Sequence, residues 1–378
     1  MRIQTLLYRE DADWSPDVAA SLDSSNTLVL AFGGSRFIEK LHFFSELKSA
    51  FPQSHVMGCS TAGEILGREI YDNSVVLAVS KFDKTRLRSE VVAMDSAAGS
   101  YAAGRAIAQA FSEPDLRAVF VLSEGLQVNG SELVKGLNAE LPDTVVVTGG
   151  LAADGHRFQQ TWVLEQGQPV SNRVAAVAFY GPDLHVGHGS MGGWDIFGPE
   201  RRVTRAAGNV LYELDGRPAL TIYKEYLGEL AAGLPAAGLR FPLALRANRG
   251  DDRRFVRTPL AIDEQASTMT FAGDIPEGYL AQLMRANYDH LIEGAEAAAL
   301  MTKRHGACVQ PLLSIAISCV GRRIVLGERT EEEVDAALDA LPEHTQQIGF
   351  YSYGEISPYA SGSCDLHNQT MTLTTFSE

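Results

Sequence analysis

The chain has 378 residues, of which 45% are hydrophobic and 21% charged, a composition typical of a folded globular protein and not of a disordered one. Its length exceeds the roughly 250–300 residues that one hydrophobic core usually supports, so two domains are expected. The formal net charge of −15 argues against nucleic acid and anionic membrane surfaces as partners, because proteins bind both through basic patches.

A basic strip between Arg246 and Arg257 is interrupted by Asp251 and Asp252, and we interpret it as a solvated loop. No apolar run approaches the roughly 20 residues needed to span a bilayer. The N-terminal residues 1–14 are too acidic for a signal peptide. These features predict a cytosolic protein without membrane insertion.

The cysteines show no C-x-x-C spacing, so neither a zinc site nor a disulfide framework is indicated. They are Cys59, Cys308, Cys319 and Cys364.

The N-terminal part of the chain predicts a unit in which apolar runs alternate with a helical pattern and a glycine turn. In chain order, its elements are a strand at 27–32, a helix up to 50, a strand at 55–57, the glycine turn GCSTAGEI at 58–65, and an antiparallel hairpin of 75–82 and 87–94.

The same order then begins again, which indicates an internal duplication. The second set is a strand at 118–122, a helix at 131–141, a strand at 144–147, the turn GGLAADG at 149–155, and a hairpin of 174–180 and 184–189.

A third instance lies near the C-terminus. It consists of a strand at 312–319, a helix at 331–341, a strand at 346–350, the turn GFYSYGEISP at 349–358 and a closing strand at 371–376. The intervening segment carries helical patterns at 219–227 and 278–303 and strand patterns at 255–262 and 268–272, which are expected to pair.

These patterns predict an α/β fold with two domains, built from repeated strand-helix-strand-hairpin units around mixed sheets. We place a lead-in at residues 1–26, one domain at 27–207 and a second at 208–378.

Signatures of common catalytic sites are absent from the sequence. The segment GHGSMG at 187–192 matches G-x-G-x-x-G, but Pro199 follows instead of a helix, which excludes a dinucleotide site. Cys59 or Ser60, at a strand-to-turn junction, could serve as the nucleophile of a hydrolase or acyl-transfer enzyme. No histidine or carboxylate can be assigned as its base, so Cys59 is expected to be a buried packing residue.

Six motifs follow one another along the chain, and together they cover roughly residues 27–375. They are GCSTAGEI, GGLAADG, GWDIFGP with VTRAAGNVLYELDGRPAL, SCVGRR, GFYSYGEISP and LHNQT. The chain therefore resembles proteins with an N-terminal and a C-terminal FIST domain.

This resemblance implies a bacterial signal-input protein that binds a small ligand. With no room for an output module, it would act in trans on a partner such as a histidine kinase or cyclase. Some stand-alone members are nitric-oxide-sensing haem proteins, and in that variant His367 or His188 would supply an axial ligand, although a hydrogen-bonded structural role is the commoner one for such histidines.

The family's hallmark positions that fall on this chain include polar residues suited to a ligand pocket. A small polar ligand needs a few converging polar groups in an apolar surrounding. The resulting ligand-binding candidates are Tyr353, Glu355, Arg322, Asn368, Ser352, Trp194 and Cys319.

Overall fold

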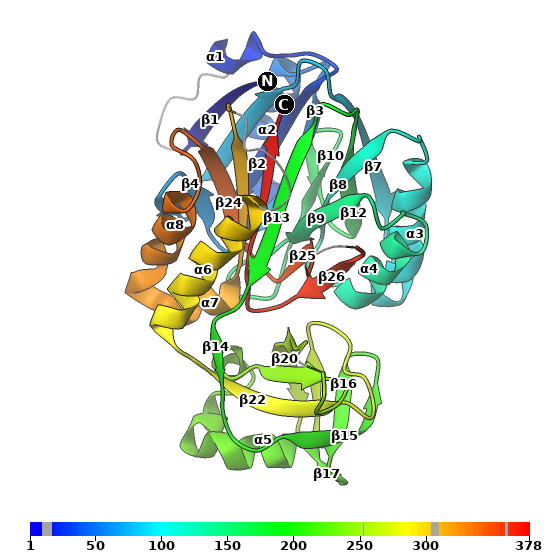
Figure 1. Ribbon diagram of the computed structural model, residues 1–378, viewed down its shortest axis with the longest axis vertical. Coiled ribbons are helices and arrows are strands. Elements are labelled where there is room, and N and C mark those ends of the chain that lie inside the picture. Colours follow the sequence, from blue (N-terminus) through cyan, green and yellow to red (C-terminus); the bar gives the residue numbers. More distant parts are fainter. Residues whose placement is uncertain (10–16, 252, 304–309, 360–361) are drawn as a thin grey trace.

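The structure is a computed structural model that describes residues 1–9, 17–251, 253–303, 310–359 and 362–378. It has a mixed α/β fold, as the sequence predicts. Three six-stranded sheets form the upper body in Figure 1, and a nine-stranded sheet with a helix forms the lower body. We call these two parts the core and the insert.

The core contains three units with the same order of strands, and the third has one more helix between its second and third strands than the other two. The first unit consists of β1 (Arg2–Tyr8), α1 (Asp17–Ala20), β2 (Thr27–Gly34), α2 (Leu41–Ala50), β3 (His55–Thr61), β4 (Glu64–Leu66), β5 (Glu69–Tyr71) and β6 (Val75–Lys81). The second consists of β7 (Arg86–Ala93), α3 (Ser100–Ala110), β8 (Leu116–Ser123), α4 (Gly130–Asn138), β9 (Val146–Leu151), β10 (Val163–Glu165), β11 (Gln168–Val170) and β12 (Arg173–Tyr180).

The third unit is interrupted by the insert. It consists of β13 (His185–Met191), α6 (Tyr288–Thr302), β23 (Leu313–Cys319), α7 (Val320–Leu326), α8 (Thr330–Asp339), β24 (Gln346–Ser352), β25 (Gly354–Pro358), β26 (Cys364–His367) and β27 (Met371–Ser377).

Each core sheet takes four strands from one unit and a two-stranded hairpin from another. The strand orders are β1-β6-β2-β3-β10-β11, β7-β12-β8-β9-β25-β26 and β13-β27-β23-β24-β4-β5. The hairpin of the first unit thus extends the sheet of the third, that of the third extends the second, and that of the second extends the first. The units are interlocked in a closed cycle.

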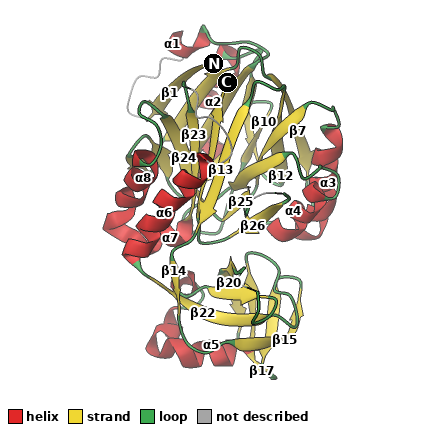
Figure 2. Ribbon diagram, in the orientation of Figure 1, coloured by secondary structure: helices red, strands yellow, loops and turns green. Residues whose placement is uncertain are grey.

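The core interior is formed by the inner faces of all three sheets, and the helices cover the outside (Figure 2). Phe179 of the second unit lies between Phe82 of the first, with ring centroids 5.7 Å apart, and Phe376 of the third, 4.6 Å away. Strand β2 is buried along its whole length, which explains its continuous apolar sequence.

The insert lies between β13 and α6. Its elements are β14 (Trp194–Ile196), β15 (Arg201–Ala207), β16 (Val210–Leu214), β17 (Arg217–Pro218), α5 (Ala219–Leu227), β18 (Leu243–Arg246), β19 (Phe255–Arg257), β20 (Pro259–Asp263), β21 (Thr268–Phe271) and β22 (Leu280–Ala286). The expected domain boundary at residues 207 and 208 falls in the turn between β15 and β16.

Two predicted hairpins are wrong. Strands β6 and β7 belong to different sheets, and so do β12 and β13. Both edges of β6 are already paired with β1 and β2, so the turn at residues 83–85 carries the chain from one sheet to the next. The hairpins are instead β4–β5, β10–β11 and β25–β26, each following the strand that enters a glycine turn.

The predicted helix at 278–303 is wrong in its first third. Residues 280–286 form β22, in which Leu283 is buried and pairs with Leu243 of β18. The helix begins only at Tyr288, where the Asn287 side chain caps it by accepting a hydrogen bond from the N–H of His290.

A glycine with a positive φ should tolerate replacement by alanine only where no atom lies close to the added Cβ. Gly149 has φ +147°, and an added Cβ would overlap the carbonyl oxygen of Val121, whereas Gly155 has φ +81° and no atom within 4 Å of an added Cβ. We expect Gly149→Ala to lower the free energy of unfolding by more than about 3 kcal/mol, and Gly155→Ala by only about 1 kcal/mol. Urea unfolding of the two variants measures the difference, and equal losses would contradict the close packing at β9.

Candidate functional site

The three glycine turns meet at the centre of the core, and their backbones bond to one another. The links run from the N–H of Ala62 to the oxygen of Tyr351 (2.8 Å), from the N–H of Ala153 to the oxygen of Ser60 (2.9 Å), and from the N–H of Tyr353 to the oxygen of Leu151 (3.3 Å). Every pair of units is joined in this way. These backbone groups of the turns are therefore engaged within the fold.

The first turn carries a buried carboxylate. Glu64 accepts hydrogen bonds from the Thr61 hydroxyl and from the backbone N–H and hydroxyl of Ser74, at 3.1 and 2.8 Å. Burial raises its pKa to about 7, against the opposing effect of these hydrogen bonds. Glu64 thus ties the turn to the residue just before β6.

The third turn repeats this geometry. Glu355 accepts hydrogen bonds from the Ser352 hydroxyl at 2.6 Å and from the N–H and hydroxyl of Thr370 at 3.2 and 2.9 Å. Its side chain is fully buried, and burial raises its pKa to about 8. Two of the predicted ligand contacts, Glu355 and Ser352, are thus bonded to each other.

The second turn carries Asp154, which holds the loop after it. Its carboxylate accepts the backbone N–H groups of residues 158, 159 and 160, at 2.8 to 3.0 Å, and the hydroxyl of Tyr353. The Tyr353 ring also stacks on Phe158, with centroids 4.7 Å apart. Tyr353 therefore links the third unit to a loop of the second.

Arg322 fastens the insert to the core. Its guanidinium forms a buried ion pair with Glu333 at 2.7 Å and donates to the carbonyl oxygens of Gly192 and Leu291, at 2.6 and 2.7 Å. Gly192 precedes the insert and Leu291 follows it, so one side chain clamps both connections.

Three further candidates lie close to this clamp. The Trp194 indole donates to the carbonyl oxygen of Gln369 at 3.0 Å, and the Asn368 amide donates to the carbonyl oxygen of His367 at 3.0 Å. Cys319 is buried at the start of α7, and burial raises its thiol pKa. The predicted set is thus clustered near the turns and the clamp, with its polar groups bonded mainly within the protein.

The two candidate haem ligands do not fit an axial role in this arrangement. His367 is buried, with Nε2 2.8 Å from the carbonyl oxygen of Ser357, and its ring packs against Tyr359. His188 is buried in the middle of β13, opposite Thr374 of β27. Neither lines any of the cavities discussed below. Within the part of the chain that the structure describes, no cluster of three or more potential ligand side chains could hold a metal ion.

The candidate nucleophiles are also buried. Burial raises the pKa of the Cys59 thiol well above its ordinary value, which disfavours the reactive thiolate. The Ser60 hydroxyl accepts the backbone N–H of Trp162 at 3.1 Å. His55 lies at the start of the same strand and contacts Ser89 at 2.8 Å.

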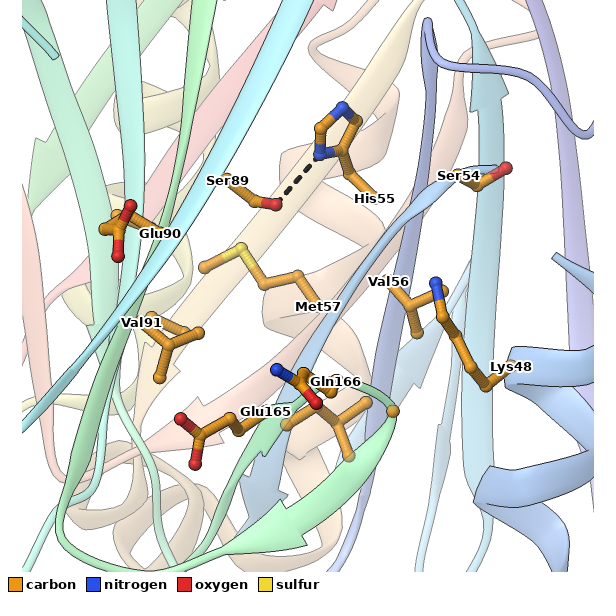
Figure 3. Close-up of a pocket in the computed structure, with 14 residues that line it drawn as sticks. Lys48, Ser54, His55, Val56, Met57, Ser89, Glu90, Val91, Glu165 and Gln166 are labelled. Atoms are coloured by element: carbon orange, nitrogen blue, oxygen red, sulfur yellow. Dashed lines mark hydrogen bonds between the residues drawn. The ribbon is translucent and has the colours of Figure 1, made fainter. Parts of the chain in front are cut away.

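Two cavities lie against the core alone. The first, of about 510 Å³, is bordered by β3, β7 and the turn between β10 and β11, with Met57 and Val91 among its apolar residues (Figure 3). The second, of about 590 Å³, lies beside the turns and is lined by Ala62, His156 and Arg323. Arg323 is paired there with Asp72 at 2.7 Å.

A third cavity, of about 500 Å³, lies between the two bodies, and we call it the junction cavity. The core contributes α4 and the start of β26; the insert contributes the β15–β16 turn, β19 and residues 274–277. Arg257 of β19 lines it with only 4% of its surface exposed.

The interpretation of the basic strip as a solvated loop is therefore wrong at its ends. Arg257 is buried, and Arg246 lies in β18 and pairs with Glu200 at 2.6 Å. Arg253 and Arg254 between them are exposed, so composition alone could not distinguish the buried arginine. A sequence signal was its position directly after Phe255 and Val256, in a predicted strand.

Two family models match the chain. The family model of the FIST N domain matches residues 27–217, and that of the FIST C domain matches residues 219–358. The chain belongs to the FIST family. FIST domains are sensor domains of signal transduction.

Individual relatives add little about activity. An uncharacterised protein of Methanocaldococcus jannaschii is 30% identical over 198 residues, a match that covers 49% of this chain and 38% of that protein. A chorismatase structure aligns with 100% of this FIST chain and 98% of its own, at 9% identity and a TM-score of 0.35. A cyanuric acid hydrolase from A. caulinodans aligns over 99% and 98%, at 9% identity and a TM-score of 0.37. No helix in the described ranges is long and apolar enough to cross a membrane.

The buried acids predict a pH-dependent stability. Because the pKa values of Glu64 and Glu355 are raised from 4.5 to about 7 and 8, the folded protein binds protons that the unfolded chain releases. The free energy of unfolding should fall as the pH rises from 4.5 through these values. Glu64→Gln and Glu355→Gln imitate the protonated acids and should each flatten this fall by on the order of 3–5 kcal/mol.

Urea unfolding across this pH range measures the effect. Glu331→Gln, at an exposed position of α8, is the matched control and should follow the unsubstituted protein. Parallel curves for Glu355→Gln and the unsubstituted protein would contradict the raised pKa.

Burial also predicts slow thiol chemistry. In a Cys308→Ser variant, the remaining cysteines, Cys59, Cys319 and Cys364, are all buried. We expect a thiol-reactive disulfide reagent to label them at least about tenfold more slowly than in the urea-unfolded chain. Rapid labelling of native Cys59 would instead indicate an accessible nucleophile.

Proposed function

We propose that the chain is a small-ligand-binding signal-input protein, without catalytic activity, that acts in trans on a signalling partner such as a histidine kinase or cyclase. The junction cavity is the observation that carries this proposal. Its walls belong to two bodies, so a ligand inside it contacts both. Ligand sites occur preferentially at such interfaces.

The connection between the bodies suits a signalling role. Two connecting segments join the insert to the core, one before β14 and one after β22. Arg322 donates hydrogen bonds to the residues that flank them, Gly192 and Leu291. Near the cavity, contact depends on a few polar groups, among them Asp274, which pairs with Lys135 at 2.7 Å and accepts from Asn129 at 3.0 Å. A ligand that binds one arrangement of the bodies more tightly would shift their equilibrium, and a partner could read that shift.

The core cavities support this role less well. The cavity in Figure 3 and the one beside the turns are each bordered by the core alone. A ligand in either of these cavities would contact the core but not the insert. The buried states of Cys59 and Ser60 likewise favour a sensor over a hydrolase.

Filling the junction cavity should abolish ligand binding. Ala206 lines the cavity from the insert, whereas its neighbour Ala207 is exposed and does not line it. We expect native mass spectrometry, or thermal unfolding with a library of amino acids, organic acids, nucleosides and sugars, to reveal a bound compound. Ala206→Phe should lose it, and Ala207→Phe should keep it.

Two outcomes would contradict this assignment. Equal binding by Ala206→Phe and the unsubstituted protein would place the ligand elsewhere. Ligand binding would be contradicted altogether if native mass spectrometry showed only the mass of the polypeptide and if no compound of the library raised the melting temperature.

A further inference from the structure

Arg257 is a buried cation without a direct carboxylate partner. Its side chain forms no ion pair with any acid of the described residues, and its close hydrogen-bond acceptors are carbonyl oxygens. The guanidinium carbon also lies 4.6 Å from the centre of the Phe255 ring, and Asp365 and Asp274 act on its charge only from a distance. A buried charge that is not paired is costly, and proteins seldom retain one without a partner. An anion in the junction cavity would supply that partner.

The guanidinium has hydrogen-bonding capacity left on one nitrogen. Nε donates to the carbonyl oxygen of Asp274 at 3.1 Å, and Nη1 donates to those of Val256 and Leu366 at 3.0 and 3.1 Å. Nη2, with two hydrogens, has only the Ser131 hydroxyl at the long distance of 3.5 Å.

Ser131 offers a second donor beside it. Its oxygen accepts the backbone N–H of Asp274 at 3.1 Å, which leaves its hydroxyl hydrogen without an acceptor among the described residues. Ser131 also lies in the first turn of α4, where the helix dipole favours negative charge. Nη2 and the Ser131 hydroxyl can therefore hold the two oxygens of one carboxylate.

The surrounding charges restrict the ligand to a single negative charge. Asp365 and Glu277 line the same cavity, while Lys135 is already paired with Glu132 and Asp274. A doubly charged phosphate would be repelled by these acids more strongly than a carboxylate.

The remaining lining is largely apolar. Val134 and Ile275 are buried there, and Phe255 and Pro276 add further apolar surface. A volume of about 500 Å³ is in the range of small-molecule sites. The body of the ligand should therefore be hydrophobic.

We propose that the junction cavity binds a small monocarboxylic acid with an apolar body, whose carboxylate is held by Nη2 of Arg257 and the hydroxyl of Ser131. This inference rests on the proposed function, because it assigns the ligand class of the same cavity. The acid links β19 of the insert to α4 of the core, so its binding draws the two bodies together.

Isothermal titration with benzoate and hexanoate tests the proposal, with benzamide and phenyl phosphate as neutral and doubly charged comparators. Benzoate should bind more tightly than either comparator. Arg257→Met should weaken benzoate binding by about tenfold to a hundredfold, since a hydrogen bond to a charged group is lost. Arg254→Met, an exposed arginine of the same segment, should bind as the unsubstituted protein does.

Ser131→Ala keeps the guanidinium of Arg257 and is the alternative variant if Arg257→Met does not fold. It should weaken benzoate binding several-fold. Benzamide binding as tightly as benzoate, phenyl phosphate binding more tightly, or full affinity in both variants would overturn the proposal. Failure of both acids to bind would also overturn it. The proposed function would stand in that case if the library screen had found another compound sensitive to Ala206→Phe.

Discussion

Each core sheet is completed by a hairpin from another unit, and the rest of the structure depends on this exchange. The glycine turns between β3 and β4, β9 and β10, and β24 and β25 send each hairpin out of its own sheet. The exchange closes only after three units, so no unit has a complete sheet by itself. It also explains the buried acids: Glu64 and Glu355 fix the ends of the outgoing hairpins to the strands that return.

The sequence predicted the repeated order of strand, helix, strand and glycine turn because that order depends on local periodicity. It failed on pairing, which is non-local. Strands β4 and β5 have three residues each, too few for a periodic signal, and β24, with which β4 pairs, lies more than 270 residues away. The apparent hairpins at residues 83–85 and 181–183 satisfied every local rule, yet their strands belong to different sheets.

The candidate site shows the same limit. The sequence predicts that motif residues such as Arg322 and Tyr353 contact a ligand, and in the structure their side chains bond to other parts of the fold. Arg257 could not be distinguished in the sequence from the other arginines of its segment, because its burial depends on how the insert packs against α4 and β26. A charge whose environment is formed by segments 100 residues apart cannot be recognised from its neighbours in the chain.

The position of the insert has a consequence for engineering. It occupies the connection between the first strand and the first helix of a unit, β13 and α6, and leaves the exchange of hairpins intact. In the second unit, the corresponding connection between β7 and α3 is only residues 94–99. A foreign domain grafted there would meet the same local topology, so the core could carry a second inserted domain without the loss of a sheet.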